Sequence, residues 1–148
     1  PLTNKPPLFS PLNAQAIISY TFDDYQVFAK NQNTYLDGIK PVDTLFNTIE
    51  EIGVMYLNNQ KAVLLSSYGT ESLYNYMDAN KMGAETYQGS EIMELPDKKF
   101  IENSFTPLVR DFTSNYCTIL ENSFIYSQDK ETLQTIISNY KTCARCYF

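Results

Sequence analysis

Two segments of the chain, offset by 60 residues, show the same order of features. Residues 53–81 (GVMYLNNQKAVLLSSYGTESLYNYMDANK) and 115–141 (NYCTILENSFIYSQDKETLQTIISNYK) each contain two short apolar runs around a turn, followed by an amphipathic stretch. Two apolar runs around a short turn predict a β-hairpin, and an apolar stripe at helical spacing predicts a helix. Because each helix follows its hairpin directly, it can fold back over it. The sequence therefore predicts two β-hairpin-helix units.

The two units also share individual positions. The offset places Ser67 on Ser127, where the second helix is expected to begin, and Glu71 on Glu131, where a carboxylate suits the positive end of a helix dipole. The inward helix positions predicted by this alignment are Leu73, Tyr76, Met77 and Asn80 in the first unit, and Leu133, Ile136, Ile137 and Tyr140 in the second. These matches favour an internal repeat. The alternative is that any hairpin followed by an amphipathic helix would look alike.

The remaining segments predict further elements of both kinds. Residues 14–22 are rich in β-branched and aromatic side chains and predict a strand. Residues 41–51 carry an i, i+3, i+4, i+7 apolar pattern behind Pro41 and predict a helix. Residues 86–95 predict one strand with a bend at Gly89-Ser90. Two stretches are less regular: residues 23–36 fit a helical face loosely, and residues 100–113, interrupted by Pro107, predict a broken helix or a covering loop.

These elements together predict an α+β fold, with a mostly antiparallel sheet and helices packed on one side of it. Residues 1–13 contain four prolines and are expected to form an extended lead-in. Residues 14–148 are expected to form a single domain, since 148 residues bury about 68–70% of the unfolded surface. A first residue other than Met suggests a fragment of a longer protein.

Charge and composition exclude several classes of function. A net charge of −6 argues against binding to nucleic acid, which requires clustered Lys and Arg. The chain has no histidine, so it lacks the imidazole base of most hydrolases, and no phosphate-binding glycine motif occurs. We therefore expect neither an enzyme nor a bound cofactor. The apolar runs are far shorter than the roughly 20 residues of a membrane span.

The three cysteines leave two alternatives open. Cys143 and Cys146 form a CxxC pair, but it follows the C-terminal end of the predicted second-unit helix, whereas redox motifs use a helix N-terminus. With Cys117 the thiols number three, one short of the four ligands of a structural zinc site. A disulfide within this set is one expectation. Free thiols, buried or near the terminus, are the other.

Tyrosine is the most distinctive residue type, with 12 copies and no Trp. Tyrosine offers rigid contact area with a polar tip, which suits a binding surface. We therefore consider an exposed face that binds a protein or a glycan, made of Tyr68, Tyr74, Tyr87 and Tyr116. The alternative is that these tyrosines fill half-buried sites that Trp would occupy elsewhere.

The segments YCTILENSFIYSQDKETLQTIISNYK and MYLNNQKAVLLSSYGTESLYNYM resemble a family of bacterial cell-envelope proteins of unknown function. The likeness extends loosely over residues 14–141, and the CxxC pair lies outside it. It implies an exported α+β domain, part of a larger protein with further β-rich modules, and supplies no catalytic residues. We therefore expect a non-catalytic extracytoplasmic module that binds partners or acts as a scaffold. The alternative is a carrier that holds a small apolar ligand between sheet and helices.

Overall fold

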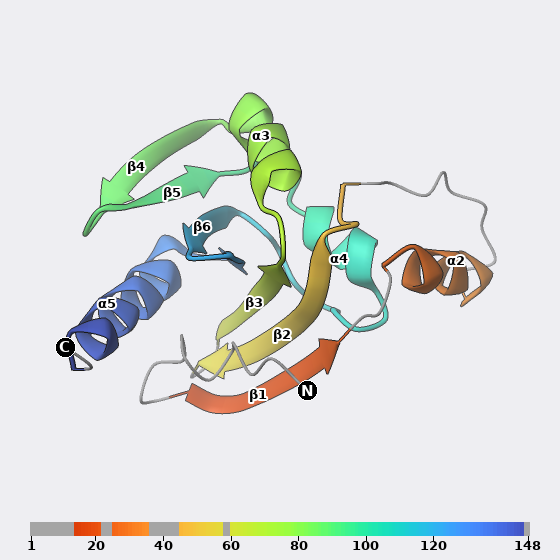
Figure 1. The fold of residues 1–148 in the computed structure, drawn as a ribbon, viewed down its shortest axis with the longest axis horizontal. Coiled ribbons are helices and arrows are strands. Elements are labelled where there is room, and N and C mark those ends of the chain that lie inside the picture. The colour runs from red at the N-terminus through yellow and green to blue at the C-terminus, as the bar shows by residue number, and fades with distance from the viewer. Residues whose placement is uncertain (1–13, 22–24, 36–44, 58–59, 147–148) are drawn as a thin grey trace.

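The computed structural model describes residues 14–21, 25–35, 45–57 and 60–146; the predicted lead-in, residues 1–13, lies outside these ranges. All strands belong to one seven-stranded antiparallel sheet in the order β1-β2-β3-β7-β6-β5-β4 (Figure 1). The strands are β1 (Ala14–Thr21), β2 (Ile49–Leu57), β3 (Gln60–Ser67), β4 (Gly83–Tyr87), β5 (Ser90–Glu94), β6 (Tyr116–Leu120) and β7 (Ser123–Ser127). The helices are α2 (Tyr25–Tyr35), α3 (Glu71–Asn80), α4 (Phe100–Phe105) and α5 (Lys130–Cys146). The predicted α+β class is confirmed.

Both predicted hairpin-helix units are present, β2-β3-α3 and β6-β7-α5. Their inner strands β3 and β7 pair antiparallel, with Val63 opposite Tyr126, so the units lie side by side at the centre of the sheet. The strand predicted at residues 14–22 is also confirmed, as β1 at the outer edge beside β2. Duplication as the origin of the two units remains a prediction from the sequence.

A third hairpin replaces the single strand predicted at residues 86–95. β4 and β5 pair antiparallel across a two-residue turn in which both Gln88 (φ 49°) and Gly89 (φ 82°) have positive φ. Two consecutive positive φ values are typical of the type I′ turn, whose twist matches that of the flanking strands. The glycine that predicted a bend therefore reverses the chain.

The prediction of a helix at residues 41–51 is wrong for residues 45–51, the part of this range that the structure describes. Residues 45–48 form a turn, and Ile49 already begins β2. Phe46 and Ile49 are buried, as the apolar pattern predicted, but strand pairing on both sides of β2 overrides the local helical periodicity.

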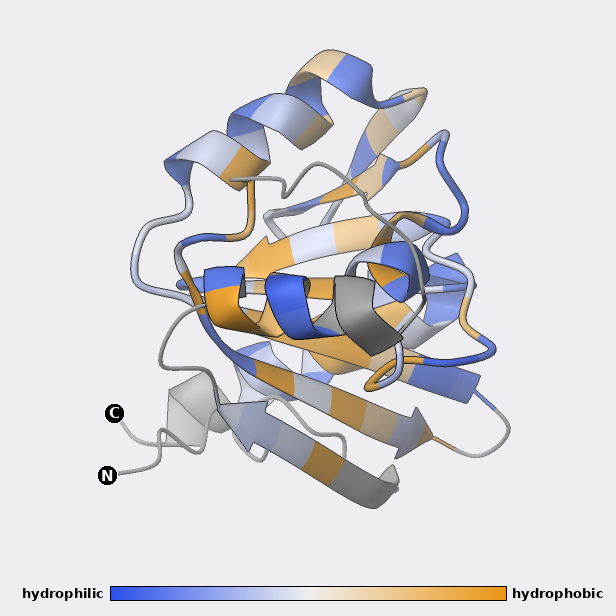
Figure 2. Ribbon diagram, turned by 90° about the vertical axis from the view of Figure 1, so that its right-hand side faces the viewer, coloured by the Kyte–Doolittle hydropathy of each residue, from blue (hydrophilic) through white to orange (hydrophobic). Residues whose placement is uncertain are grey.

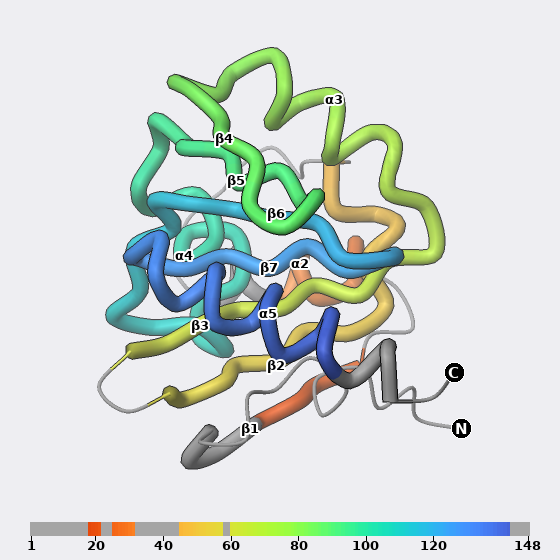
Figure 3. Tube along the Cα trace, turned by 90° about the vertical axis from the view of Figure 1, so that its left-hand side faces the viewer, coloured from red at the N-terminus to blue at the C-terminus, as the bar shows by residue number. Residues whose placement is uncertain are grey.

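The sequence predicted helices on one face of the sheet, but in the structure they cover both faces. Figure 3 views the face covered by α5, with α2 and α4 behind the sheet. The hydropathy colouring in Figure 2 shows apolar residues gathered along the strands between these layers. The α3-side core includes Tyr25, Phe46, Val63, Leu65, Leu73, Met77, Phe105 and Tyr126. The α5-side core consists of Met55, Leu57, Ala62, Leu64, Ile92, Leu120, Ile125, Leu133, Ile136 and Ile137.

The lengths of the two inner strands, β3 and β7, explain why α3 and α5 cover opposite faces of the sheet. β3 has 8 residues and β7 has 5, counted from equivalent hairpin turns. Side chains alternate between faces along a strand, so an odd difference in length reverses the face at which the strand ends. Ser67 therefore ends β3 on the face of Leu65, in the α3-side core, whereas Ser127 ends β7 on the face of Ile125, in the α5-side core.

Candidate binding site

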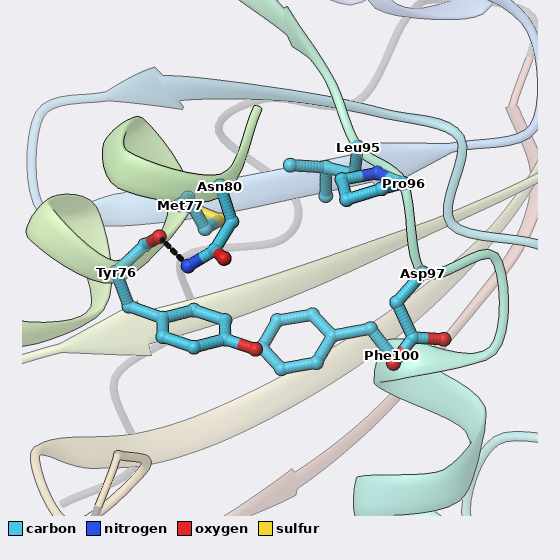
Figure 4. A pocket seen from close by; sticks show the side chains of 7 residues that line it. All are labelled: Tyr76, Met77, Asn80, Leu95, Pro96, Asp97 and Phe100. Atoms are coloured by element: carbon cyan, nitrogen blue, oxygen red, sulfur yellow. Dashed lines mark hydrogen bonds between the residues drawn. The ribbon is translucent and has the colours of Figure 1, made fainter. Parts of the chain in front are cut away.

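A small open pocket lies between the C-terminal half of α3 and the segment that links β5 to α4 (Figure 4). Its volume is about 60 Å³. The lining is mostly apolar and consists of Tyr76, Met77, Asn80, Leu95, Pro96, Asp97 and Phe100. Sequence positions almost twenty residues apart meet here because the β4-β5 hairpin returns the chain to the end of α3.

The floor and one wall of the pocket are rigidly supported. Met77 and Leu95 form the floor and belong to the α3-side core. The rings of Tyr76 and Phe100 stack with centroids 5.5 Å apart and an interplanar angle of 24°. Phe100 in turn packs on Phe46, at 5.3 Å between centroids. Tyr76 thus keeps 43% of its surface exposed while its ring is held in place.

The rim carries a few polar groups of mixed charge. Asn80 donates from Nδ2 to the Tyr76 carbonyl oxygen at 2.7 Å. Asp97 Oδ1 accepts from the Lys99 backbone N–H at 3.1 Å, and none of the ion pairs in the described part of the chain involves Asp97. The ammonium of Lys98 donates to the Leu95 carbonyl oxygen at 3.0 Å. Asp97 supplies the one carboxylate of the lining, and the Lys98 ammonium is bonded to the carbonyl oxygen of another lining residue, Leu95, so the pocket favours no strongly charged ligand.

Ion pairs join α3 to β5 beside the pocket. Lys81 contacts Asp78 at 2.7 Å and Glu91 at 3.0 Å, and these hydrogen bonds raise the pKa of Lys81. Tyr74 donates its hydroxyl to Glu91 at 3.2 Å, and the charge of Glu91 raises the pKa of Tyr74. These contacts hold the end of α3 over β5, which keeps Tyr76 opposite Leu95.

Cys117 and Tyr126 lie below the pocket floor, where the Tyr126 hydroxyl donates to Met77 Sδ at 3.2 Å. Cys117 is a free thiol with no exposed surface. Burial raises the pKa of both Cys117 and Tyr126, so neither ionises near neutral pH. A buried neutral thiol is chemically inert, so Cys117 acts as a core residue.

The other two cysteines, Cys143 and Cys146, lie in α5. The sequence predicted that the CxxC pair follows the end of this helix. In the structure the helix continues through Cys143 and Cys146, so the pair lies within its last turns. Their side chains lie outside the described residues, and a disulfide between them remains a prediction. Within the described ranges, no group of three or more His, Cys, Asp or Glu side chains could hold a metal ion.

The four predicted surface tyrosines do not gather at one place. Tyr87 and Tyr116 border the α5-side core, where Tyr87 shares a 3.0 Å hydrogen bond with Ser138. Tyr74 borders the α3-side core, and Tyr68 is 71% exposed after the end of β3. The sequence missed Tyr76, because the 60-residue alignment assigned it to the buried stripe.

Comparison with known proteins finds no matching family model, no similar curated protein and no similar solved structure. None of the helices in the described ranges is long and apolar enough to span a bilayer.

Proposed function

We propose that this domain is a non-catalytic binding module of a bacterial envelope protein, displayed outside the cytoplasm, and that its pocket receives an apolar side chain of a protein partner. Tyr76 carries the proposal, because its exposed ring is fixed by Phe100 over an open apolar floor. Aromatic side chains with a rigid contact area and a polar tip are enriched at binding interfaces.

The size of the pocket favours a side chain over a free ligand. Sites for drug-sized molecules have volumes of roughly 300–1,000 Å³. The pocket, at about 60 Å³, is far below this range and can receive a small apolar side chain or the end of a larger one. A carrier of an apolar molecule, the alternative function, would need a larger cavity between the sheet and a helix.

The chemistry of the rim favours a protein over a glycan. A glycan presents many hydroxyls and needs several hydrogen-bonding partners, whereas the lining offers only three polar side chains, those of Tyr76, Asn80 and Asp97. The Tyr76 hydroxyl makes no hydrogen bond to the described residues and can donate to a partner's backbone carbonyl. An uncharged, apolar anchor residue in an extended peptide fits these groups.

The location in the envelope is supported by the resemblance of the two hairpin-helix units to exported bacterial proteins. Protease treatment of intact source cells, followed by detection with an antibody against this domain, tests it. Loss of the signal from intact cells is expected. A signal that disappears only after lysis would contradict an exposed location.

Selection from a displayed peptide library on the immobilised full chain tests the binding function. Selected peptides should share one apolar residue and bind Tyr76→Ala at least about tenfold more weakly, a change of about 1.4 kcal/mol. Tyr68→Ala is the matched control, since Tyr68 is exposed but does not line the pocket, and it should bind as the wild type does.

Four results would overturn this function. Selection without any recurrent apolar residue would remove the proposed anchor, as would equal binding by Tyr76→Ala. Retention of oligosaccharides on a glycan array, sensitive to Tyr76→Ala, would replace the protein partner with a glycan. A lipid found bound by native mass spectrometry would favour the carrier.

A further inference from the structure

β1 and β4 are the first and last strands of the sheet and form its two lateral edges (Figures 1 and 3). An edge strand presents unpaired backbone N–H and C=O groups that can pair with another chain. Folded proteins protect such edges with short strands, charged side chains, proline or bulges. The two edges of this sheet differ in that protection.

β4 is a protected edge. It has 5 residues, includes Glu85 and belongs to a tight hairpin. Glu85 forms an ion pair with Lys130 at 3.3 Å, which places an ammonium group beside the edge. A second extended chain would have to displace these charges, which opposes pairing at β4.

Within the described part of the chain, β1 lacks most of these protective features. It has 8 residues, AQAIISYT, with no charged residue and no proline. Ile18 is 44% exposed and Tyr20 is 40% exposed, so apolar surface accompanies the unpaired backbone. The only irregularity is a register shift between Ala14 and Ala16, at the start of the strand. A long, uncharged and partly apolar edge strand is a site for strand addition.

We propose that β1 pairs antiparallel with β1 of a second copy across a two-fold axis, which joins the two sheets into one. A two-fold interface is self-complementary, since it uses the same patch on both copies. The chain carries a net charge of −6, which disfavours contact between copies at most surfaces. The uncharged β1 is suited to such a contact, because no like charges face each other across the paired strands.

The side chains of β1 match this arrangement. Ile18 and Tyr20 are paired with Val54 and Ile52 of β2, and Val54 and Ile52 belong to the α3-side core. A two-fold axis perpendicular to the sheet brings Ile18 and Tyr20 of both copies to the same face of the joined sheet. Cross-strand pairs of aromatic and β-branched side chains stabilise such a junction.

The dimer goes beyond the proposed binding function and does not depend on it. The Tyr76 pocket lies next to β5, five strand positions from β1. In the joined sheet the two pockets are eleven strand spacings apart, roughly 50 Å along the sheet at about 4.8 Å per strand. Both would remain open, so the dimer would present two sites to one partner and increase its avidity.

Sedimentation velocity of the full chain tests the dimer. A strand-sized interface is small, so we expect a dissociation constant on the order of 10 μM and a mass that rises from one chain to two across this concentration. Ile18→Lys should sediment as a monomer at every concentration. Thr86→Lys adds the same charge to the exposed β4 edge and should dimerise as the wild type does.

Hydrogen exchange of the full chain separates a lost interface from a lost fold. Backbone amides of β1 should become more protected as wild-type concentration rises, and those of Ile18→Lys should not, while the protection of β3 and β7 stays equal in both. A wild type that remains monomeric, a dimer that persists in Ile18→Lys, or growth beyond two chains would each overturn the proposal.

Discussion

The two hairpin-helix units have the same order of elements but place their helices on opposite faces of the sheet. Their local chemistry agrees: Ser67 and Ser127 each end the second strand, and each hydroxyl donates to the carbonyl two residues ahead, of Gly69 and Asp129. Their strand lengths differ by an odd number of residues, and that difference reverses the face. Similar sequence patterns can therefore lead to different packing.

The two faces are also covered differently. The α3-side core draws residues from α2, α3 and α4, whereas α5 is the only helix that contributes to the α5-side core among the described residues. Short helices that share a face each bury a narrow stripe. In α5 the stripe includes Ile136, which is fully buried, whereas its aligned counterpart Tyr76 in α3 is 43% exposed.

The largest expected effect tests this pair of aligned positions. Ile136→Ala should reduce the free energy of unfolding by about 2–5 kcal/mol, because it empties part of a sealed core. Tyr76→Ala should cost less than about 1 kcal/mol, since an exposed ring loses mainly its stacking on Phe100. Urea denaturation measures both values. Equal losses would show that the two helices bury equivalent stripes after all.

An intermediate effect is expected at the two strand-ending serines. Ser67→Ala removes a hydroxyl that donates its one proton to either the Thr48 hydroxyl or the Gly69 carbonyl and accepts from the Gly69 N–H, and should cost about 1–2 kcal/mol. Ser127→Ala removes the single bond to Asp129 and should cost about 0.5–1 kcal/mol. Thermal unfolding of both variants provides the comparison. If Ser127→Ala were the more damaging change, the richer network around Ser67 would contribute little.

The smallest effect concerns Tyr140 of α5. Burial and a 2.8 Å hydrogen bond to Glu121 raise the pKa of Tyr140 to about 12. A tyrosine whose pKa is higher in the folded than in the unfolded state contributes its full stabilisation below the ordinary pKa of about 10. That stabilisation decreases as the pH rises from this value to the pKa of the folded state. Tyr140→Phe should therefore cost about 0.5 kcal/mol at pH 8, and its disadvantage should shrink from pH 10 to 12.

Urea denaturation at several pH values measures this dependence, with Tyr74→Phe of α3 as the matched variant. Glu91 raises the pKa of Tyr74, so its disadvantage should also shrink at alkaline pH. A pH-independent cost for both variants would mean that neither hydroxyl titrates differently on folding.

Much of the fold could be predicted from local patterns. Alternation and turn residues predicted both unit hairpins, and helical spacing predicted the buried Leu133, Ile136 and Ile137. The same reasoning failed at Ile49–Glu51, where an apolar pattern of helical period belongs to a strand paired on both sides. Patterns within one segment do not contain the partner strands that override them.

The candidate site was less accessible to prediction. The tyrosines were recognised as the distinctive residue type, yet the pocket uses Tyr76, which was predicted to be buried, together with Leu95, Pro96 and Phe100 from another segment. Their proximity depends on the β4-β5 hairpin, which the sequence had presented as one strand. An error in one turn therefore concealed the site.

By itself the sequence determined the elements that short-range forces control: the hairpins of the two hairpin-helix units, the long amphipathic helix, the absence of histidine and the uncharged character of β1. The tertiary structure decided which face each helix covers, which strands form the edges and where the pocket opens. The physical reason is that side-chain alternation has a period of two. One residue more or less in a strand leaves its composition almost unchanged but exchanges its two faces.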